Sequence, residues 1–223
     1  DLNRKDQKHF SVKTIGFFQS GSDANNALYD IATYTWSDRR KKLQPQDANQ
    51  MNEDGEILYL SGIFGAGRGK MSRVGLWGND RTLKDWVVKS PLVRSLTDLN
   101  AKEIAEAVEA ENNALIEIEN KLKDPKYRVG GFFIEPIVGS QVFFYRQEFI
   151  LKVQSLCHQY EIPIFADEIL SGGARTGRFF GFMHYDGFVP DYITFGKALY
   201  TSGILRVDKD TDLDHINDRI ADS

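Results

Sequence analysis

The sequence predicts an α/β fold in which a mostly parallel sheet is covered by helices on both faces. Three segments, GGFFIEP, IPIFADE and DYITFGK, have the apolar character of buried strands and end in polar residues. Other segments carry apolar residues at helical spacing, and they alternate with the strands along the chain. Strands that are apolar throughout and are separated by helices are typical of parallel sheets buried on both sides.

The expected elements alternate between strand and helix from one end of the chain to the other. The first strand and helix are joined by a turn at Gly21 and Ser22, and a polar stretch after the helix is expected to be a surface loop. A long amphipathic helix is expected to end before Pro125. The expected order is strand 15–20, helix from 24, loop 37–55, strand 56–62, helix 98–124, strand 130–136, helix 149–160, strand 162–168 and strand 191–197.

Composition restricts the class of function. The 28 basic and 32 acidic residues give a net charge of −4 without long blocks, which gives no support to a role on nucleic acid or at a membrane surface. Cys157 is the only cysteine, so an internal disulfide is excluded and a reducing cytoplasm fits. The four histidines show no metal-ligand spacing, and no metal site is expected. We therefore expect a cytoplasmic protein with small-molecule partners.

Two ionisable side chains follow two of the predicted strands. Asp167 ends the strand in IPIFADE, and Lys197 follows the strand in DYITFGK thirty residues later. Ligands of open α/β sheets bind at the carboxyl ends of the strands. There, a carboxylate can keep a pyridine nitrogen protonated and an amine can form an imine with an aldehyde. We expect Lys197 to be partly buried, which would lower its affinity for protons. The alternatives are that Asp167 caps the next segment or pairs with Arg175, and that Lys197 is an ordinary surface lysine.

The turn between the first strand and the first helix is a candidate phosphate site. The four residues of this turn, Ser20, Gly21, Ser22 and Asp23, lie where free backbone N–H groups and the positive end of the helix dipole favour an anion. The alternative is that Ser22 or Asp23 only caps the helix. A second glycine-rich segment, Gly65 to Lys70, fits neither the dinucleotide fingerprint nor the Walker spacing, and we interpret it as a loop.

Three further side chains are candidates for a role beside a flat ring. Ile169 could lie against one face of the ring, and Phe64 could stack on it, although both residue types are common in cores. Glu135 follows a predicted strand and brings another carboxylate to the same edge. It could tune the charge of an active site or hold a loop.

Several segments together resemble the class III aminotransferases, which are pyridoxal-phosphate enzymes of the aspartate aminotransferase fold. These segments are QSGSDANNAL, FFIEPIVGS and IFADEILSGGARTGRFFGFMHYDGFVPDYITFGKAL, and with their order and spacing the resemblance covers most of the stretch from Gly16 to Leu205. It implies a predominantly parallel sheet of the seven-stranded type, pyridoxal 5'-phosphate as cofactor, and a homodimer. The implied reaction moves an amino group from an amino acid or other amine to a keto acid.

The resemblance also implies roles for individual residues. Lys197 would carry the internal aldimine and shuttle a proton, Asp167 would pair with the pyridinium nitrogen, and Ile169 would pack on one ring face. The phosphate would be held by Gly21 and Ser22. Phe64 would stack on the opposite ring face, and Glu135 would lie near the substrate side of the pocket. The chain departs from the family pattern at several positions, among them Leu170, Gly173 and Ala174.

We expect residues 1–223 to form a single pyridoxal-phosphate-binding large domain with its core at about 16–206, and the N-terminal segment and the C-terminal small domain of the family to be absent. Two alternatives to an aminotransferase stay open. One is an aminomutase or decarboxylase on the same scaffold, which would keep Lys197 and Asp167. The other is a catalytically degenerate binding or scaffold protein.

Overall fold

The computed structural model describes residues 11–43, 56–60, 87–88, 91–124, 126–139 and 142–208. Its order of elements confirms the predicted alternation of strands and helices. The helices are α1 (Gly21–Leu43), α2 (Ala101–Lys123) and α3 (Gln147–Gln159). The strands are β1 (Ser11–Phe18), β2 (Glu56–Leu60), β3 (Val87–Val88), β4 (Val129–Ile134), β5 (Ile137–Val138), β6 (Phe143–Phe144), β7 (Ile164–Asp167), β8 (Tyr192–Phe195) and β9 (Ser202–Asp208).

The central sheet contains seven strands in the order β1-β9-β8-β7-β4-β2-β3. The pairs β2–β3, β2–β4, β4–β7 and β7–β8 are parallel, which confirms the prediction of a mostly parallel sheet. β9 lies between β8 and β1 and is antiparallel to both. β5 and β6 form a separate two-stranded sheet.

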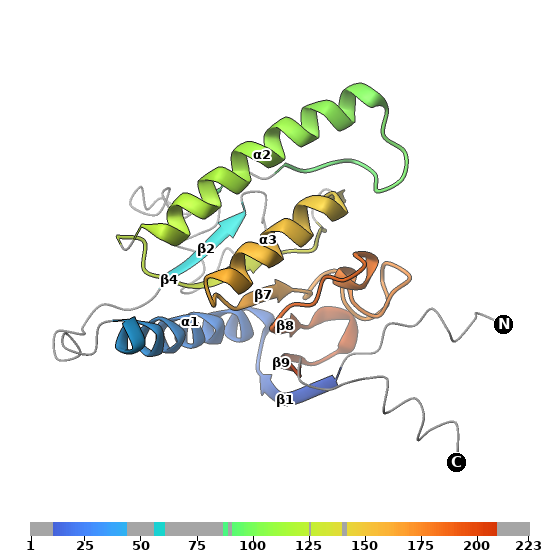
Figure 1. The fold of residues 1–223 in the computed structure, drawn as a ribbon. Coiled ribbons are helices and arrows are strands. Elements are labelled where there is room, and N and C mark those ends of the chain that lie inside the picture. The colour runs from blue at the N-terminus through green and yellow to red at the C-terminus, as the bar shows by residue number, and fades with distance from the viewer. Residues whose placement is uncertain are drawn as a thin grey trace, which may run out of the picture.

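Helices cover both faces of the central sheet, as predicted. Figure 1 shows α1 on one side of the sheet and α2 and α3 on the other. The side chains of β4 explain this arrangement, because neighbouring residues of a strand point to opposite faces. Phe133 packs in the cluster that contains Leu28 of α1, whereas Phe132 and Ile134 belong to the larger cluster with the helices of the other face.

Helix α1 lies unusually close to the sheet. A Cβ atom added at Gly130 of β4 would lie 2.0 Å from the carbonyl oxygen of Ala32, so only glycine permits this approach of helix to strand. The predicted loop from Ser37 is wrong for residues 37–43, which continue α1. The segment contains Arg and Lys, which are good helix formers but carry no apolar periodicity that would identify a helix.

Strand β9 and the short strands β3, β5 and β6 were not predicted. The prediction of α2 is confirmed, and its capping residues explain why the helix begins at Ala101. Asn100 accepts a hydrogen bond from the backbone N–H of Glu103, and the Glu103 carboxylate accepts one from the N–H of Asn100. None of the helices in the described part of the chain combines the length and apolar character that a bilayer crossing requires.

Candidate functional site

The ends of β7 and β8 bring Asp167 and Lys197 to the same edge of the sheet. The two strands are parallel, and Asp167 is in register with Thr194 of β8. The next N–H, that of Glu168, donates to the carbonyl oxygen of Thr194 at 2.9 Å. Lys197 begins a 3₁₀ turn directly after Gly196. Because both strands run in the same direction, both side chains leave the sheet at its carboxyl edge.

Asp167 is a buried carboxylate held by neutral donors. Its side chain is 6% exposed. One oxygen, Oδ2, accepts from Nδ2 of Asn25 at 2.9 Å, and Oδ1 accepts from the N–H of Ile169 at 2.9 Å. Burial raises the pKa of Asp167, and these hydrogen bonds and the charge of Lys197 partly offset the effect. The hydrogen-bonded partner on α1 is therefore Asn25, whereas Arg175 is exposed.

Lys197 is exposed, so the prediction that it is partly buried is wrong. The physical reason is its place in the chain: it is the first residue of a surface turn after β8 rather than a residue of the strand. Its backbone has φ of +42°, a value that residues with a side chain rarely adopt. Burial raises the pKa of Glu135 and Asp167, and the positive charge of Lys197 lowers both, so the amine lies within electrostatic reach of these carboxylates.

The start of α1 lies at the same edge. Ser20 is the capping residue, since its Oγ accepts from the N–H of Asp23 at 3.1 Å and donates to Oδ2 of Asp23 at 2.7 Å. The cap is therefore Ser20, whereas the sequence pointed to Ser22 or Asp23. The N–H groups of Gly21 and Ser22 belong to the first turn, where the helix itself offers them no acceptor.

The side chain of Ile169 lies between the start of α1 and the residue before Lys197. A Cβ added at Gly21 would lie 2.6 Å from Cδ1 of Ile169, and one added at Gly196 would lie 3.3 Å from Cγ2. Both glycines thus leave the space that Ile169 occupies. The structure therefore brings together Gly21, Ile169 and the turn that carries Lys197.

Glu135 is a second buried carboxyl group at this edge. It follows β4 and is 6% exposed. Its Oε1 accepts from the N–H of Gly139 at 3.1 Å, and its buried Oε2 has no hydrogen-bond partner among the described residues. Burial raises the pKa of Glu135 to about 8, and the charge of Asp167 adds to the shift. At neutral pH this carboxyl group is largely protonated, so it can donate a hydrogen bond.

Glu168 points to different partners from those of Asp167, as expected for neighbouring residues at a strand end. It is fully buried and accepts hydrogen bonds from Oγ of Ser171 and from the N–H groups of Gly181 and Phe182, the last two at 2.8 and 2.7 Å. Its hydrogen bonds therefore link Ser171, near the start of the loop that begins with Ile169, to Gly181 and Phe182 at the other end of that loop. Burial raises the pKa of Glu168 to about 7.

The family of the chain follows from its match to a family model. The model for "Aminotransferase class-III" matches residues 1–221. The chain belongs to the class III aminotransferase family.

Curated relatives and solved structures agree with this family. An adenosylmethionine-8-amino-7-oxononanoate aminotransferase of Buchnera aphidicola (subsp. Baizongia pistaciae) is 35% identical over 49% of this chain and 25% of the relative. An ornithine aminotransferase of Plasmodium chabaudi chabaudi is 38% identical over 39% of this chain and 20% of the relative. The lysine aminotransferase of M. tuberculosis has the same fold, with a TM-score of 0.73 at 21% identity, over 93% of this chain and 46% of that chain. The chain thus spans less than half the length of these proteins.

The residues at the carboxyl edge of this class III aminotransferase chain fit pyridoxal phosphate, the cofactor of the family. Asp167 offers a buried carboxylate with a raised pKa, and a cationic N–H beside it would lower that pKa and stabilise the ionised form. Glu135 offers a buried oxygen with no partner among the described residues. The first turn of α1 offers N–H groups suited to a phosphate. Phe64 and the segment Gly65 to Lys70 lie outside the described residues.

One residue that was not selected from the sequence, Asn25, also contributes to this edge. Asn25 had a detectable signal, because it stands at helical spacing from the buried Leu28, Tyr29 and Ala32. A polar residue within the apolar stripe of a helix needs a polar partner inside the protein. Ser20, which the sequence placed in the candidate phosphate site, also has the ordinary signal of a capping residue, a serine three positions before an acidic residue.

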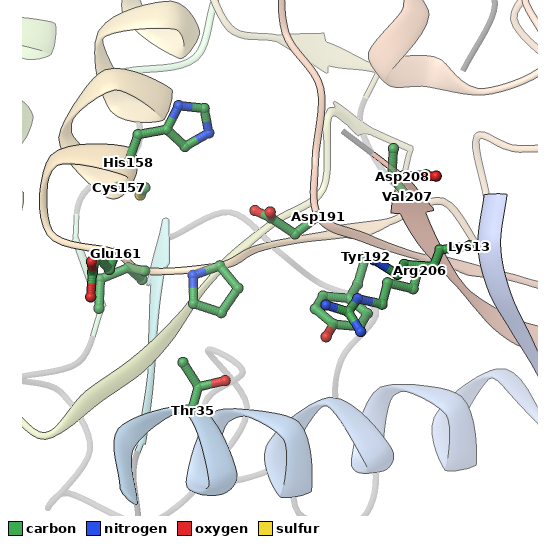
Figure 2. Close-up of a pocket in the computed structure, with 12 residues that line it drawn as sticks. Lys13, Thr35, Cys157, His158, Glu161, Asp191, Tyr192, Arg206, Val207 and Asp208 are labelled. Carbon is green, nitrogen blue, oxygen red and sulfur yellow. The ribbon is translucent and has the colours of Figure 1, made fainter. Parts of the chain in front are cut away.

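A pocket of about 540 Å³ lies at the opposite edge of the sheet of this aminotransferase chain (Figure 2). Its lining includes Asp191, which directly precedes β8, and Arg206, whose guanidinium carbon lies 5.9 Å from the ring centre of Tyr192. Figure 2 shows Thr35 of α1 on one side of it and His158 of α3 on another. Among the described residues, none of those predicted to bind the cofactor lines this pocket.

Proposed function

We propose that this chain forms the cofactor-binding domain, residues 1–223, of a pyridoxal-phosphate-dependent aminotransferase. It would move an amino group from an amino acid or other amine to a keto acid. One observation carries the proposal: a buried acid, an exposed amine and a helix start meet at the carboxyl edge of a parallel sheet. These are Asp167, Lys197 and the first turn of α1.

The role of Asp167 follows from its burial and its hydrogen bonds. When bound, pyridoxal phosphate supplies an aldehyde that links to amines and a ring that withdraws electrons from them. Asp167 would accept a hydrogen bond from the ring N–H and keep the ring nitrogen protonated, because a buried carboxylate favours a nearby positive charge. The hydrogen bonds from Asn25 and Ile169 leave lone pairs on the carboxylate for this contact.

Lys197 would act through its Nζ atom. Its side chain is exposed at the edge beside Asp167, so Nζ is free to reach a ligand there. Nζ would hold the cofactor through its aldehyde, and the same amine would be the group that moves a proton of the substrate.

The remaining residues would position the cofactor. Gly21 and Ser22 would donate their backbone N–H groups to the phosphate. Ile169, held between Gly21 and Gly196, would pack on one face of the ring. Phe64 would stack on the other face. Glu135 would lie on the substrate side, where its protonated carboxyl group can donate a hydrogen bond.

The experiment that tests this function uses purified protein and pyridoxal phosphate. We expect a visible absorption band, which borohydride removes while it attaches the cofactor to the peptide that contains Lys197. Lys197→Ala should abolish both signals. Lys13→Ala, which removes a lysine at the opposite edge of the sheet, is the matched control and should keep both. A wild-type protein without the band, or attachment at another lysine, would contradict the proposal.

The nature of the reaction is tested with the loaded protein. Adding amines and watching for conversion to pyridoxamine phosphate identifies an aminotransferase. Release of carbon dioxide or a rearranged amine would instead show a decarboxylase or an aminomutase. A loaded protein that reacts with no amine would be a binding or scaffold protein.

We also propose that the protein is cytoplasmic and that it acts as a homodimer, the second of these as the family resemblance implies. The charge balance and the single cysteine fit the cytoplasm. Sedimentation of the purified protein measures the assembly. A mass of twice 25.4 kDa is expected, and a mass of one chain at all concentrations would contradict the dimer.

A further inference from the structure

A buried hydrogen bond joins α1 to the end of β7. Nδ2 of Asn25 donates to Oδ2 of Asp167 at 2.9 Å, across 142 positions of sequence. Asn25 is 3% exposed. Since a carboxylate oxygen only accepts hydrogen bonds, the amide must present its NH₂ group to Asp167 and its Oδ1 elsewhere.

The other end of the same amide has no hydrogen bond. Oδ1 of Asn25 is buried and has no partner among the described residues. A buried acceptor without a donor destabilises the folded state, and an apolar side chain of similar size would avoid this loss. What an asparagine provides at this position, among Leu28, Tyr29 and Ala32, is therefore the hydrogen bond to the buried Asp167.

Helix α1 is a rigid support for this contact. The helix packs on β4 where the backbone of Ala32 closely approaches Gly130. Its first residue, Gly21, lies against the side chain of Ile169. Asn25 follows Gly21 by about one helical turn. The proposed phosphate site and the donor to Asp167 are thus on one short, fixed piece of helix.

We propose that Asn25 is a positioning residue that orients the Asp167 carboxylate toward the ring nitrogen of pyridoxal phosphate. It sets the position of Asp167 relative to the phosphate site at the start of the same helix. Asn25 acts through Asp167 and needs no contact with the cofactor. This inference rests on the proposed function, and it assigns a role to a residue outside the set predicted from sequence.

The test compares two ligands that differ at one ring atom. Pyridoxal phosphate has the ring nitrogen, and its 1-deaza analogue has carbon there, so Asp167 can bind only the first through a ring N–H. Dissociation constants of both ligands are measured for the wild type, Asn25→Leu and Asn25→Ala. The control is Tyr34→Ala, which removes an exposed side chain from the same helix.

We expect Asn25→Leu to raise the dissociation constant of pyridoxal phosphate by about tenfold, which is the order of effect of a hydrogen bond to a charged group. The dissociation constant of the deaza analogue should stay unchanged. Asn25→Ala should show the same selectivity, and Tyr34→Ala should change neither constant. Equal weakening of both ligands would reveal a purely structural role and overturn the inference. Unchanged binding of both would also overturn it.

A measurement on the wild type covers the case in which both Asn25 variants fail to fold. The NMR signals of the Asn25 side-chain NH₂ group should shift when pyridoxal phosphate binds and shift less with the deaza analogue. Equal shifts with the two ligands would contradict the inference. A wild type that binds neither ligand would refute the proposed function itself, and this outcome is distinct from the others.

Discussion

At the scale of single residues, three of the five non-glycine residues with positive φ in the described part of the chain lie beside the candidate site, and the other two are Val142 and Glu161. Ala174, Lys197 and Tyr200 have φ of +64°, +42° and +56°, and all three lie in the segments that follow β7 and β8. Residues with a side chain are rarely found in this region, and such strain is often stored at functional sites. The neighbouring Gly173, with φ of +75°, adopts a similar conformation without that strain.

Exchanging alanine and glycine at two adjacent positions tests this strain. Ala174→Gly should raise the free energy of unfolding by about 1 kcal/mol, because glycine adopts a positive φ without steric penalty. Gly173→Ala should lower it, since its Cβ would also lie 2.7 Å from Cβ of Ala198. Urea unfolding of both variants gives the two values. Destabilisation by Ala174→Gly would contradict the role of strain here.

The sequence could predict the acid and the amine of the site but could not predict how they are held. Asp167 and Lys197 follow apolar strands, a local pattern that can be read directly. The bond from Asn25 joins distant segments, and the burial of Glu168 depends on the loop that folds back to Phe182. The exposure of Lys197 depends on the turn that follows β8, which the strand pattern does not describe.

At the scale of elements, the contact between α1 and β4 determines where the candidate site lies. The helix carries Gly21, Ser22 and Asn25, and it packs on the sheet through the backbone contact between Ala32 and Gly130. A shift of this helix would separate the helix start from Asp167. The packing of an element distant from the chemistry is thus coupled to the geometry of the site.

Gly130→Ala tests this coupling. The added methyl group would meet backbone rather than a flexible side chain, so α1 must move, and we expect a loss of stability of about 3 kcal/mol or more. Gly16→Ala is the control, because its Cβ would make an ordinary contact of 3.5 Å with a Phe18 side chain. Thermal unfolding of both variants measures the difference. Equal losses of stability in the two variants would show that the contact between α1 and β4 tolerates displacement of the helix.

The parallel strands could be predicted because each is a short, continuously apolar run, and the helices because their apolar residues recur at helical spacing. Strand β9 could not, since its pairing partners β1 and β8 determine its direction and it lacks a helix before it. The end of α1 was missed because residues 37–43 are polar and resemble a loop in composition. A polar helix segment and a polar loop can have the same composition, so composition indicates the backbone conformation only weakly.

At the scale of the whole molecule, burial of carboxyl groups links stability to pH. Burial raises the pKa of Glu135 to about 8 and that of Glu168 to about 7, both from an ordinary value of 4.5. The folded state therefore retains protons that the unfolded state releases. The contribution of both groups to stability is full below pH 4.5 and is lost as the pH rises through about 7 and 8.

Glu135→Gln should reduce this dependence, because glutamine stays neutral and can keep the hydrogen bond to Gly139. We expect the free energy of unfolding to fall less steeply between pH 6 and 8 than in the wild type, by up to about 1.4 kcal/mol per pH unit. Urea unfolding at several pH values measures the slopes. The exposed Glu109→Gln is the control, and identical slopes in both variants would contradict the assignment.

The antiparallel insertion of β9 has a consequence for synthesis of the protein on the ribosome. β1 is made first among the described strands, yet its partner in the sheet is the last of them to emerge, with Ser11 opposite Asp208. Until then β1 and β8 both present unpaired edges to the surroundings. A nascent chain is thus most exposed to unwanted association just before β9 leaves the exit tunnel.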